Sequence, residues 1–587
     1  MSVLKDLMWF FKSEKKSYFV GIFILLLIGC LQVILPYAVR IIADGIKAGT
    51  LTREVLMMWS VIALGIGITT YFLGYIWRVM LFGAANRLGR LLRNRLYQQF
   101  SSMSPQFFHK KRTGDLMAHA TNDIRAIEMT AGEGVLTLAD SIIKGSVVII
   151  AMVILVDWKL TLVALIPMPF MAYATSKLGT VLHKRFHKAQ AAFSDTNDKV
   201  QENISGVRVI KAFGQEDAEK KDFDHLLDDV VDKNIAVARV DSMFDPVITM
   251  VVGLSYFFTL AYGSYGIING TLTIGELIQF TMYLGFLIWP LLAFGWLFNI
   301  VERGRASYDR VNSLLQTKPD IADQSGARDE VPSGDLVYQI EKYVYPKGNV
   351  PVLSHVDFKL KRGETLGIVG KTGSGKSTLL RLLLREFDVA EKEILIGGKS
   401  IQSFRLESLR KAIGYVPQDH FLFSTTVAEN IAFGKPDATQ AEIDRVAKLA
   451  CIHEDILSFE SGYETIVGER GVTLSGGQKQ RISIARALLL NPEILILDDS
   501  LSAVDAKTEH SILDALRKER AGKTTMISAH RLSAVEQATN IIVLNDGKVI
   551  EQGSHRELME QKGWYRMTYD QQQLESVVME GGGAIGN

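Results

Sequence analysis

The length of 587 residues exceeds what one hydrophobic core supports and indicates several domains. The formal net charge of +1 gives no reason to expect a nucleic-acid partner. The two cysteines, Cys30 in an apolar run and Cys451 in the C-terminal half, indicate neither a disulfide framework nor a cysteine metal site.

The first half of the chain has the pattern of a membrane domain. Residues 4–11 are mostly apolar and are followed by Lys12, Lys15 and Lys16, which is typical of a short helix on a membrane surface rather than of a removable signal peptide. Crossing a bilayer takes about 20 helical residues. Six apolar stretches are long enough, near residues 18–42, 55–81, 137–156, 159–178, 246–268 and 275–298.

Basic residues predict how these spans are oriented. The connections between spans two and three, and between spans four and five, are rich in Lys and Arg, whereas the opposite side carries only Lys47, Arg53 and Lys159. We therefore predict a multi-pass protein of the cell membrane. Both termini and the whole second half of the chain would lie in the cytoplasm.

The two long cytoplasmic connections have helical rather than loop-like patterns, so the membrane helices are expected to extend well beyond the bilayer. Their tips, near 112–124 and 213–221, have the turn residues that begin short transverse helices. Two solvated hairpins would give the same pattern. Contact with a cytoplasmic partner domain explains the length of both connections better.

Asp140 and Lys144 lie four residues apart on one face of the third span, toward its cytoplasmic end. Ionisable groups at membrane depth are functional candidates. A pair at this spacing can also neutralise itself. A structural ion pair and a contact with a transported substrate both remain open.

Residues 317–333 are polar and predict a linker between a membrane domain at 1–316 and a second domain at 334–572. In the second domain an apolar strand at 365–369 and a helix from Thr378 enclose the sequence Gly370-Lys371-Thr372-Gly373-Ser374-Gly375-Lys376-Ser377. This strand–loop–helix context is typical of a P-loop. Backbone N–H groups and the helix dipole favour phosphate there, Lys376 can reach the β- and γ-phosphates, and Ser377 can ligate Mg²⁺.

Further stretches can complete a nucleotide site. The ring of Tyr345, ahead of the P-loop, can stack on adenine or simply pack against a strand. The amide of Gln418 can contact Mg²⁺ or its water, Asp498 at the end of the strand 494–497 can hold Mg²⁺, and His530 follows a last strand. A signature segment, Leu474-Ser475-Gly476-Gly477-Gln478, leads into a helix and forms a second anion site.

The order of these motifs resembles the nucleotide-binding domain of ATP-binding cassette (ABC) transporters, for which the signature segment before an apolar strand ending in Asp is highly specific. Residues 1 to about 572 resemble a bacterial half-transporter of the multidrug exporter type, most closely the BmrC-like half of the heterodimeric exporters of Gram-positive bacteria. The resemblance implies an α-helical membrane domain of six transmembrane helices fused to an α/β P-loop ABC ATPase domain.

The resemblance also implies residue roles. Tyr345 would stack on adenine, residues 370–378 would hold the phosphates of ATP, and Asp498 would order Mg²⁺ together with Ser377 and Gln418. Gln418 would also link the nucleotide state to the membrane domain, and His530 would contact the γ-phosphate. The signature segment would close over ATP held by a second chain, and the tips near 112–124 and 213–221 would be coupling helices.

Asp499 departs from the family pattern, which has Glu directly after the Mg²⁺ aspartate. The shorter side chain withdraws the carboxylate by about 1.5 Å. Positioning or activating water requires hydrogen-bond reach, so hydrolysis at the chain's own site is expected to be slow. Heterodimeric exporters resemble this arrangement, with a weakened carboxylate and an intact signature segment in one chain.

We therefore expect a subunit of an ATP-driven exporter that moves amphipathic drugs or similar hydrophobic compounds out of the cell by alternating access. Its partners would be the bilayer and a second half-transporter, with a heterodimer favoured over a homodimer. The alternatives are a lipid flippase, a peptide exporter, or a regulatory ATP-binding subunit with little turnover of its own. Residues 573–587 are expected to form a flexible tail.

Overall fold

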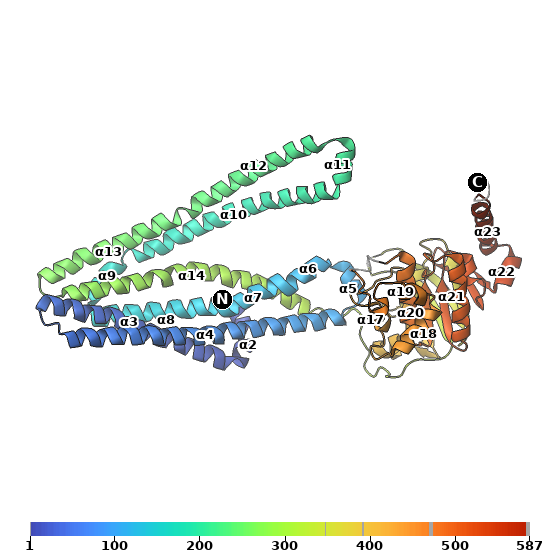
Figure 1. Cartoon of the computed structure of the whole chain (residues 1–587), viewed down its shortest axis with the longest axis horizontal. Coiled ribbons are helices and arrows are strands. Elements are labelled where there is room, and N and C mark those ends of the chain that lie inside the picture. The colour runs from blue at the N-terminus through green and yellow to red at the C-terminus, as the bar shows by residue number, and fades with distance from the viewer. Residues whose placement is uncertain (1, 347, 390–391, 469–473, 583–587) are drawn as a thin grey trace. The chain divides into compact units, whose positions relative to one another are not determined.

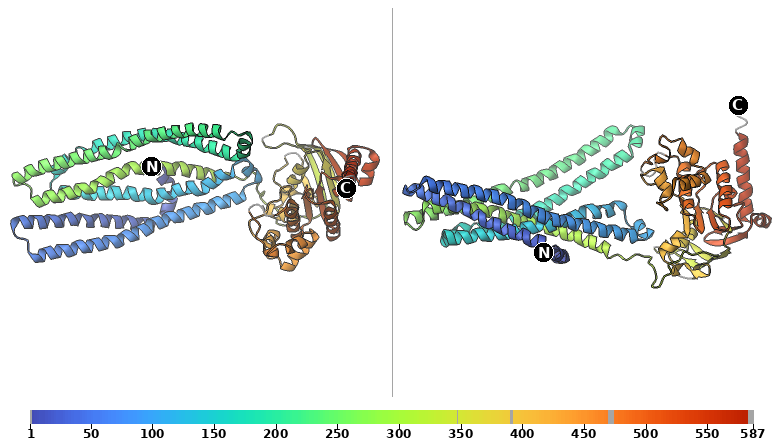
Figure 2. Two further views of the ribbon diagram at one scale, coloured as in Figure 1. Left: turned by 45° about the horizontal axis from the view of Figure 1, so that its top comes forward. Right: turned by 60° about the horizontal axis from the view of Figure 1, so that its bottom comes forward.

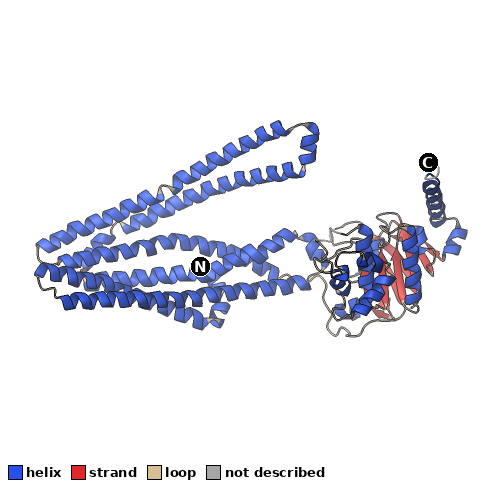
Figure 3. Ribbon diagram, in the orientation of Figure 1, coloured by secondary structure: helices blue, strands red, loops and turns tan. Residues whose placement is uncertain are grey.

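The computed structural model describes residues 2–346, 348–389, 392–468 and 474–582. Contacts divide the chain into two compact units, Met1–Ser102 with Lys111–Thr317 and Met103–Lys110 with Lys318–Asn587. The first unit is helical and the second combines helices with strands, as the colours in Figure 3 show.

The first unit is built from long helices (Figures 1 and 2). Two short π-helical segments, η1 (His119–Asp123) and η2 (Thr130–Gly134), join three of its helices into the continuous run Thr113–Leu155. The helices are α1 (Ser2–Asp6), α2 (Met8–Ser13), α3 (Lys15–Ala48), α4 (Arg53–Ser102), α6 (Thr113–Ala118), α7 (Ile124–Met129), α8 (Val135–Leu155), α9 (Trp158–Leu165), α10 (Met168–Ser205), α11 (Val207–Phe213), α12 (Glu216–Asp241), α13 (Phe244–Ile268) and α14 (Ile274–Leu315).

Within the described residues, five helical runs are long and apolar enough to cross a membrane. They contain the first five predicted spans, and the sixth, 275–298, forms the first part of α14. The five runs are Lys15–Ala48, Arg53–Ser102, Thr113–Leu155, Trp158–Ser205 and Glu216–Ile268.

Local capping fixes where these helices begin and end. Gly49 follows α3 with φ +66°, a left-handed conformation that glycine adopts without strain. The carboxylate of Asp157 accepts from Leu160 N at 2.6 Å and starts α9, and Thr273 and Glu276 form a capping box at the start of α14. The short turns between spans are therefore encoded by their own residues.

The short helices at the tips of the two long connections lie close to the predicted ranges but do not coincide with them. The range 112–124 holds α6 and η1, while α5 (Pro105–Lys110), just before it, belongs to the second unit. At the second tip, α11 runs across the ends of α10 and α12 (Figure 1), so the crossing helix ends where the predicted range 213–221 begins.

The second unit contains two sheets. A four-stranded sheet has the order β2–β1–β4–β5, and a six-stranded sheet has the order β10–β9–β3–β8–β7–β6 with parallel pairing from β9 to β6. The strands are β1 (Leu336–Tyr343), β2 (Leu353–Leu360), β3 (Thr365–Gly370), β4 (Ile394–Ile396), β5 (Lys399–Ser400), β6 (Ile413–Val416), β7 (Ile494–Asp498), β8 (Thr524–Ser528), β9 (Asn540–Asn545) and β10 (Lys548–Gly553).

Helices cover the larger sheet and enclose two apolar cores. Strands β3, β7 and β8 are buried nearly throughout, as expected for parallel strands covered on both faces. The helices are α15 (Lys376–Leu383), α16 (Leu406–Lys411), α17 (Val427–Ala432), α18 (Gln440–Leu449), α19 (His453–Leu457), α20 (Gly476–Leu489), α21 (Ala506–Glu519), α22 (His555–Gln561) and α23 (Trp564–Gly582), with 3₁₀ turns η3 (Ile401–Ser403), η4 (Gly462–Glu464) and η6 (Leu532–Val535).

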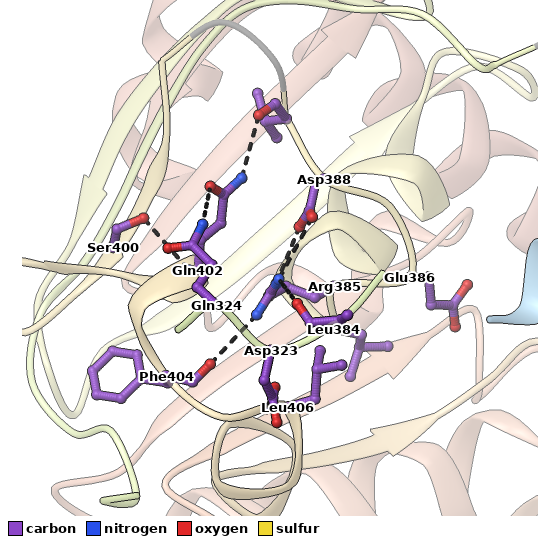
Figure 4. A network of polar contacts seen from close by, with 12 residues as sticks. Asp323, Gln324, Leu384, Arg385, Glu386, Asp388, Ser400, Gln402, Phe404 and Leu406 are labelled. Atoms are coloured by element: carbon purple, nitrogen blue, oxygen red, sulfur yellow. Dashed lines mark hydrogen bonds and ion pairs between the residues drawn. The ribbon is translucent and has the colours of Figure 1, made fainter. Parts of the chain in front are cut away.

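The predicted linker is fastened to the second unit rather than free (Figure 4). Leu406 N donates to Asp323 Oδ1 at 2.8 Å. Arg385, only 1% exposed, donates to the carbonyls of Ala322 and Phe404, each at 3.4 Å. A buried guanidinium satisfied by backbone carbonyls holds the linker against the segment that follows α15.

The C-terminal segment is more ordered than the sequence suggested. A flexible tail was expected from residue 573, yet α23 continues to Gly582. Gln571 Nε2 donates to Glu575 Oε1 one turn later at 2.9 Å, and the glycines that oppose helix formation begin only at residue 581. Residues 583–587 lie outside the described residues.

Candidate nucleotide-binding site

The P-loop lies between β3 and α15, where its glycines are required by close approaches. Gly370 has φ +145°, and a Cβ there would lie 2.1 Å from the carbonyl oxygen of Leu544. Gly375 has φ +101° and would meet Leu353 Cδ2 at 2.8 Å. Since neither position accepts a side chain, the loop can turn its backbone N–H groups toward one anion.

Two side chains of the loop are prepared for phosphate. The Lys376 ammonium donates to the carbonyls of Gly370 at 2.8 Å and Lys371 at 3.1 Å, and burial lowers the pKa of Lys376. The Ser374 hydroxyl is buried and has no hydrogen-bond partner among the described residues. A buried donor without a partner is costly. An entering phosphate would satisfy Ser374 and give Lys376 an anionic partner.

Ser377 and Asp498, predicted as Mg²⁺ ligands, lie together. Ser377 Oγ donates to Asp498 Oδ1 at 3.0 Å, and the Tyr415 hydroxyl lies 3.4 Å from Asp498 Oδ2. Burial raises the pKa of Asp498, and the Ser377 hydrogen bond opposes that rise. A hydroxyl and a carboxylate oxygen at this spacing fit Mg²⁺, which prefers oxygen ligands and retains waters and phosphates for the rest of its shell.

Gln418 contacts Asp499, the residue directly after the predicted Mg²⁺ ligand Asp498. Its Nε2 donates to Asp499 Oδ2 at 3.3 Å. The backbone of Asp499 is left-handed, with φ +48°, and its N–H donates to Ser528 O at 2.9 Å. The carboxylate is therefore held by its own backbone position and by the amide of Gln418.

Asp499 and His530 line one cavity of about 240 Å³. Glu509 from α21 lines it too, and burial raises the pKa of Glu509 against the effect of nearby Arg531. Gln572 Nε2 donates to His530 O at 2.9 Å and fixes the backbone that carries the imidazole. Two of the three predicted catalytic residues, Asp499 and His530, thus line a common space, whereas the third, Gln418, is not among its described lining residues.

The ring of Tyr345 is half-buried. Its hydroxyl lies 2.9 Å from Thr378 Oγ1 in α15, and its ring meets Phe387 at a centroid distance of 5.0 Å and an angle of 83°. These contacts place Tyr345 next to the P-loop helix. They satisfy a packing role and leave stacking on adenine as a prediction.

The signature segment begins α20 with a capping box. Ser475 Oγ accepts from Gln478 N at 3.3 Å, and Gln478 Oε1 accepts from Ser475 N at 3.0 Å. Gln478 Nε2 also reaches Asp455 Oδ1 at 3.2 Å, and Arg481 pairs with Asp455 at 2.8 Å. Residues 469–473, directly before the segment, lie outside the described residues.

The structure does not join the signature segment to the P-loop of the same chain. The described hydrogen bonds of the segment stay within it or go to Asp455, Lys479 and Arg481. Sequence reasoning missed Asp455, Arg481 and the Tyr415 hydroxyl. The motif Tyr415-Val416-Pro417-Gln418 was the available signal for Tyr415, whereas the Asp455 contact spans a separation that no local pattern reveals.

Comparisons with known proteins agree with this architecture. Residues 18–291 match the family "ABC transporter transmembrane region", and residues 353–502 match the family "ABC transporter". The chain is 48% identical over 580 residues to the "Multidrug resistance-like ATP-binding protein MdlA" of Escherichia coli K12, covering 98% of both chains. It is 46% identical to the "Probable multidrug resistance ABC transporter ATP-binding/permease protein YheI" of Bacillus subtilis 168, covering 99% of this chain and 100% of that one.

A solved structure, "Structure of a bacterial Atm1-family ABC exporter with ATP bound", matches 94% of this chain and 99% of its own, with a TM-score of 0.80 and 27% identity. These matches confirm the predicted fold class, a helical membrane domain fused to an ABC ATPase domain, and with it the binding of ATP. The chain therefore belongs to the ABC transporter family. It is an ATP-hydrolysing translocase of the exporter type and is similar to MdlA and YheI.

Proposed function

We propose that this chain is one half of an asymmetric exporter that moves amphipathic, hydrophobic compounds out of the cell. The observation that carries the proposal is Asp499. It stands where the family pattern has Glu, next to a Mg²⁺ aspartate and a P-loop that are intact. The printed names of the MdlA and YheI proteins support a multidrug range of substrates.

The geometry around Asp499 supports slow hydrolysis at the chain's own site. The bond from Asp499 N to Ser528 O fixes the backbone, so the shorter side chain cannot be moved forward by a shift of the chain. Its carboxylate already accepts from Gln418. A base or water-positioning group needs a reach of about 2.6–3.2 Å to the proton it takes, and Asp499 starts about 1.5 Å short of a glutamate.

This chain's P-loop still binds ATP under the proposal. Lys376 would leave the carbonyls of Gly370 and Lys371 for the β- and γ-phosphates, and Ser377 and Asp498 would hold Mg²⁺. The metal ion, when bound, supplies charge that stabilises the transferring phosphoryl group. The site would thus bind ATP and hydrolyse it slowly.

The signature segment would serve the other site of the dimer. The capping box satisfies the N–H groups of Ser475 and Gln478, and the N–H groups of Gly476 and Gly477 remain at the helix N-terminus for the phosphate of a nucleotide on the partner. Among the described residues, no hydrogen bond joins the segment to its own P-loop, which supports its use by a partner chain. A partner with a glutamate at the position of Asp499 would provide the fast site.

Membrane vesicles containing the chain alone, or the chain with its co-expressed partner, test the proposal. We expect ATP-driven export of an amphipathic fluorescent dye, and an oligomer of unlike chains by native mass measurement. Equal transport by the purified chain alone, measured as a homodimer, would overturn the asymmetric arrangement while leaving export intact.

The proposed orientation places both termini and the ATPase domain in the cytoplasm of a cell-membrane protein. Single cysteines at Thr50 and Asn269, in a chain whose Cys30 and Cys451 are replaced, lie in turns between helices. Both are expected to react with an impermeant thiol reagent added outside the cell. Reaction from the inside only would exclude this orientation.

A further inference from the structure

The first unit contains a cavity of about 540 Å³ between α3, α4, α8 and α14. A volume of this size lies within the range of about 300–1,000 Å³ typical of small-molecule sites. Most of its lining is apolar, and the side chains that could orient a ligand are Gln32, Thr70, Lys144, Phe286 and Trp289.

Lys144 is the one ionisable residue among the described residues that line this cavity. Its ammonium pairs with Asp140 Oδ1 at 2.9 Å, but Asp140 does not line the cavity. The side chain of Lys144 is 29% exposed and that of Asp140 16%. Of this ion pair, the cavity lining contains the cation, Lys144, and not the carboxylate, Asp140.

An ammonium at the depth of Lys144 in the membrane costs desolvation free energy. Lys144 precedes Leu155, the last residue of α8, by about 16 Å of helix rise. This is roughly half of a hydrocarbon core about 30 Å thick, which is deeper than the cytoplasmic end where the sequence alone placed it. Charged side chains at such depth are costly and mark substrate contacts when they face a cavity. Asp140 offsets part of that cost. An ammonium has three donors, so one carboxylate oxygen leaves others for a ligand.

The rest of the lining suits a flat apolar body. Phe286 and Trp289, both from α14, supply aromatic surface to the cavity. Thr70 Oγ1 donates to Ile66 O at 2.8 Å, so its hydroxyl keeps accepting capacity, and the amide of Gln32 can donate or accept. The cavity thus presents aromatic walls, neutral polar groups and one cation.

We propose that this cavity selects amphipathic aromatic compounds that carry one anionic group, a sulfonate, carboxylate or phosphate, which binds the ammonium of Lys144. A cationic ligand would face that ammonium directly, while Asp140 lies outside the lining. An anion would share the ammonium with Asp140 as a charge-assisted hydrogen bond in apolar surroundings. The inference rests on the proposed export function and specifies its substrate class.

Two dyes that differ in one charged group test the inference. 1-Anilinonaphthalene-8-sulfonate and N-phenyl-1-naphthylamine share their aromatic frame, and only the first is anionic. Binding of each is measured by fluorescence to the full chain with its partner in lipid nanodiscs. We expect the sulfonate to bind the wild-type protein about tenfold more tightly than the neutral dye, the size of one charge-assisted hydrogen bond.

Variants assign the effect to Lys144. Lys144→Gln is expected to weaken sulfonate binding about tenfold and to leave neutral-dye binding unchanged, which also reports an intact fold. Lys144→Arg retains the preference, and Asp140→Asn strengthens sulfonate binding because the competing carboxylate is removed. Lys177→Gln, a lysine on α10 that does not line the cavity, is the matched control and has no effect.

Equal sulfonate binding by wild type and Lys144→Gln would overturn the inference, as would a preference for the neutral dye. ATP-driven export is measured separately with the same dyes. Export of both dyes without a charge preference would contradict the inferred anion preference and support the proposed export function. Charge-dependent binding without export of either dye would support the inferred anion preference and contradict the proposed export function.

Discussion

The P-loop helix α15 follows Gly375 and the signature helix α20 begins at Gly476, yet their N-termini are occupied in different ways. At α15 the loop side chains can still bind an anion. Lys376 donates to backbone carbonyls, and the Ser374 hydroxyl lacks a hydrogen-bond partner among the described residues. At α20 a capping box between Ser475 and Gln478 satisfies the N–H groups of these two residues. Both helix N-termini favour phosphate electrostatically. They differ because the P-loop has a buried hydroxyl without a partner among the described residues, whereas the capping side chains of the signature segment are paired.

The difference concerns how each terminus is completed. The α15 terminus has a metal pair, Ser377 and Asp498, within its own chain. The α20 terminus is tied to Asp455, Arg481 and the segment around Ala503, and Arg481 is itself paired with Asp455. One terminus therefore belongs to a site that a single chain nearly completes, and the other is a rigid element suited to lending backbone donors to a partner.

The largest expected effect is on the α15 side. Lys376→Ala removes the ammonium aimed at the γ-phosphate, and we expect ATP trapping at the chain's own site to weaken by about a hundredfold, since charged hydrogen bonds contribute about 1.5–3 kcal/mol each. Photoaffinity labelling of this chain with an azido-ATP measures it. Lys361→Ala, an exposed lysine outside the loop, is the control and should cost little. Unchanged trapping in Lys376→Ala would remove Lys376 from this role.

A smaller but more specific effect is expected at α20. In Gly477→Ala the new Cβ would lie 2.9 Å from the carbonyl oxygen of Ala503, so the helix start must shift. We expect total ATPase activity of the complex to fall about tenfold, because small displacements of catalytic elements are costly, with ATP trapping by this chain's P-loop unchanged. Gly476→Ala is the comparison for packing against Ala503 alone, because its Cβ would meet Ala503 Cβ at an ordinary 3.8 Å. Equal losses in the two variants would contradict a packing origin.

Contacts of this kind separate what the sequence could predict from what it could not. The Ser377–Asp498 contact, the spans and the capping Ser475 follow from local motifs whose geometry is fixed by strand and helix ends. The placement of Gln418 on Asp499, the Asp455–Arg481 pair and the buried Arg385 join residues distant in sequence or depend on loop conformation. Their residue types fit many alternatives, so only the tertiary structure selects one. The extent of α23 was missed because a polar, Gln-rich segment is equally compatible with a tail.

A third, weaker effect tests the rigidity of α20 through pH. Burial would raise the pKa of Asp455, but hydrogen bonds from Arg481 and Gln478 outweigh it and lower that pKa. A lowered folded-state pKa means that the pair stabilises the fold above the unfolded value, about 3.9, and that this stabilisation is lost as pH falls through the folded value.

Thermal unfolding at a series of pH values measures this contribution. Asp455→Asn is expected to lower Tm by a few degrees at pH 7, and the difference from wild type should shrink below about pH 4. Glu460→Gln, which replaces an exposed carboxylate, is the control and should shift Tm little at any pH. A difference that persists unchanged into acid would mean that the ion pair contributes nothing and that packing alone holds α20.

The smallest expected effect is the most decisive for the comparison of the two termini. Asp499→Asn keeps the side chain's size and its contact with Gln418 while removing the charge, so a carboxylate already out of reach loses little by neutralisation. We expect the ATPase rate of the complex to change by less than about twofold, within the scatter of variants that do not touch the transition state. Asp499→Glu restores about 1.5 Å of reach and should instead raise turnover at this chain's site, seen as faster loss of trapped ATP. If Asp499→Asn abolishes the activity of a transport-competent complex, Asp499 acts as the catalytic carboxylate. The chain's own site at α15 then hydrolyses ATP efficiently, and the proposed asymmetry between the two ATP sites is wrong.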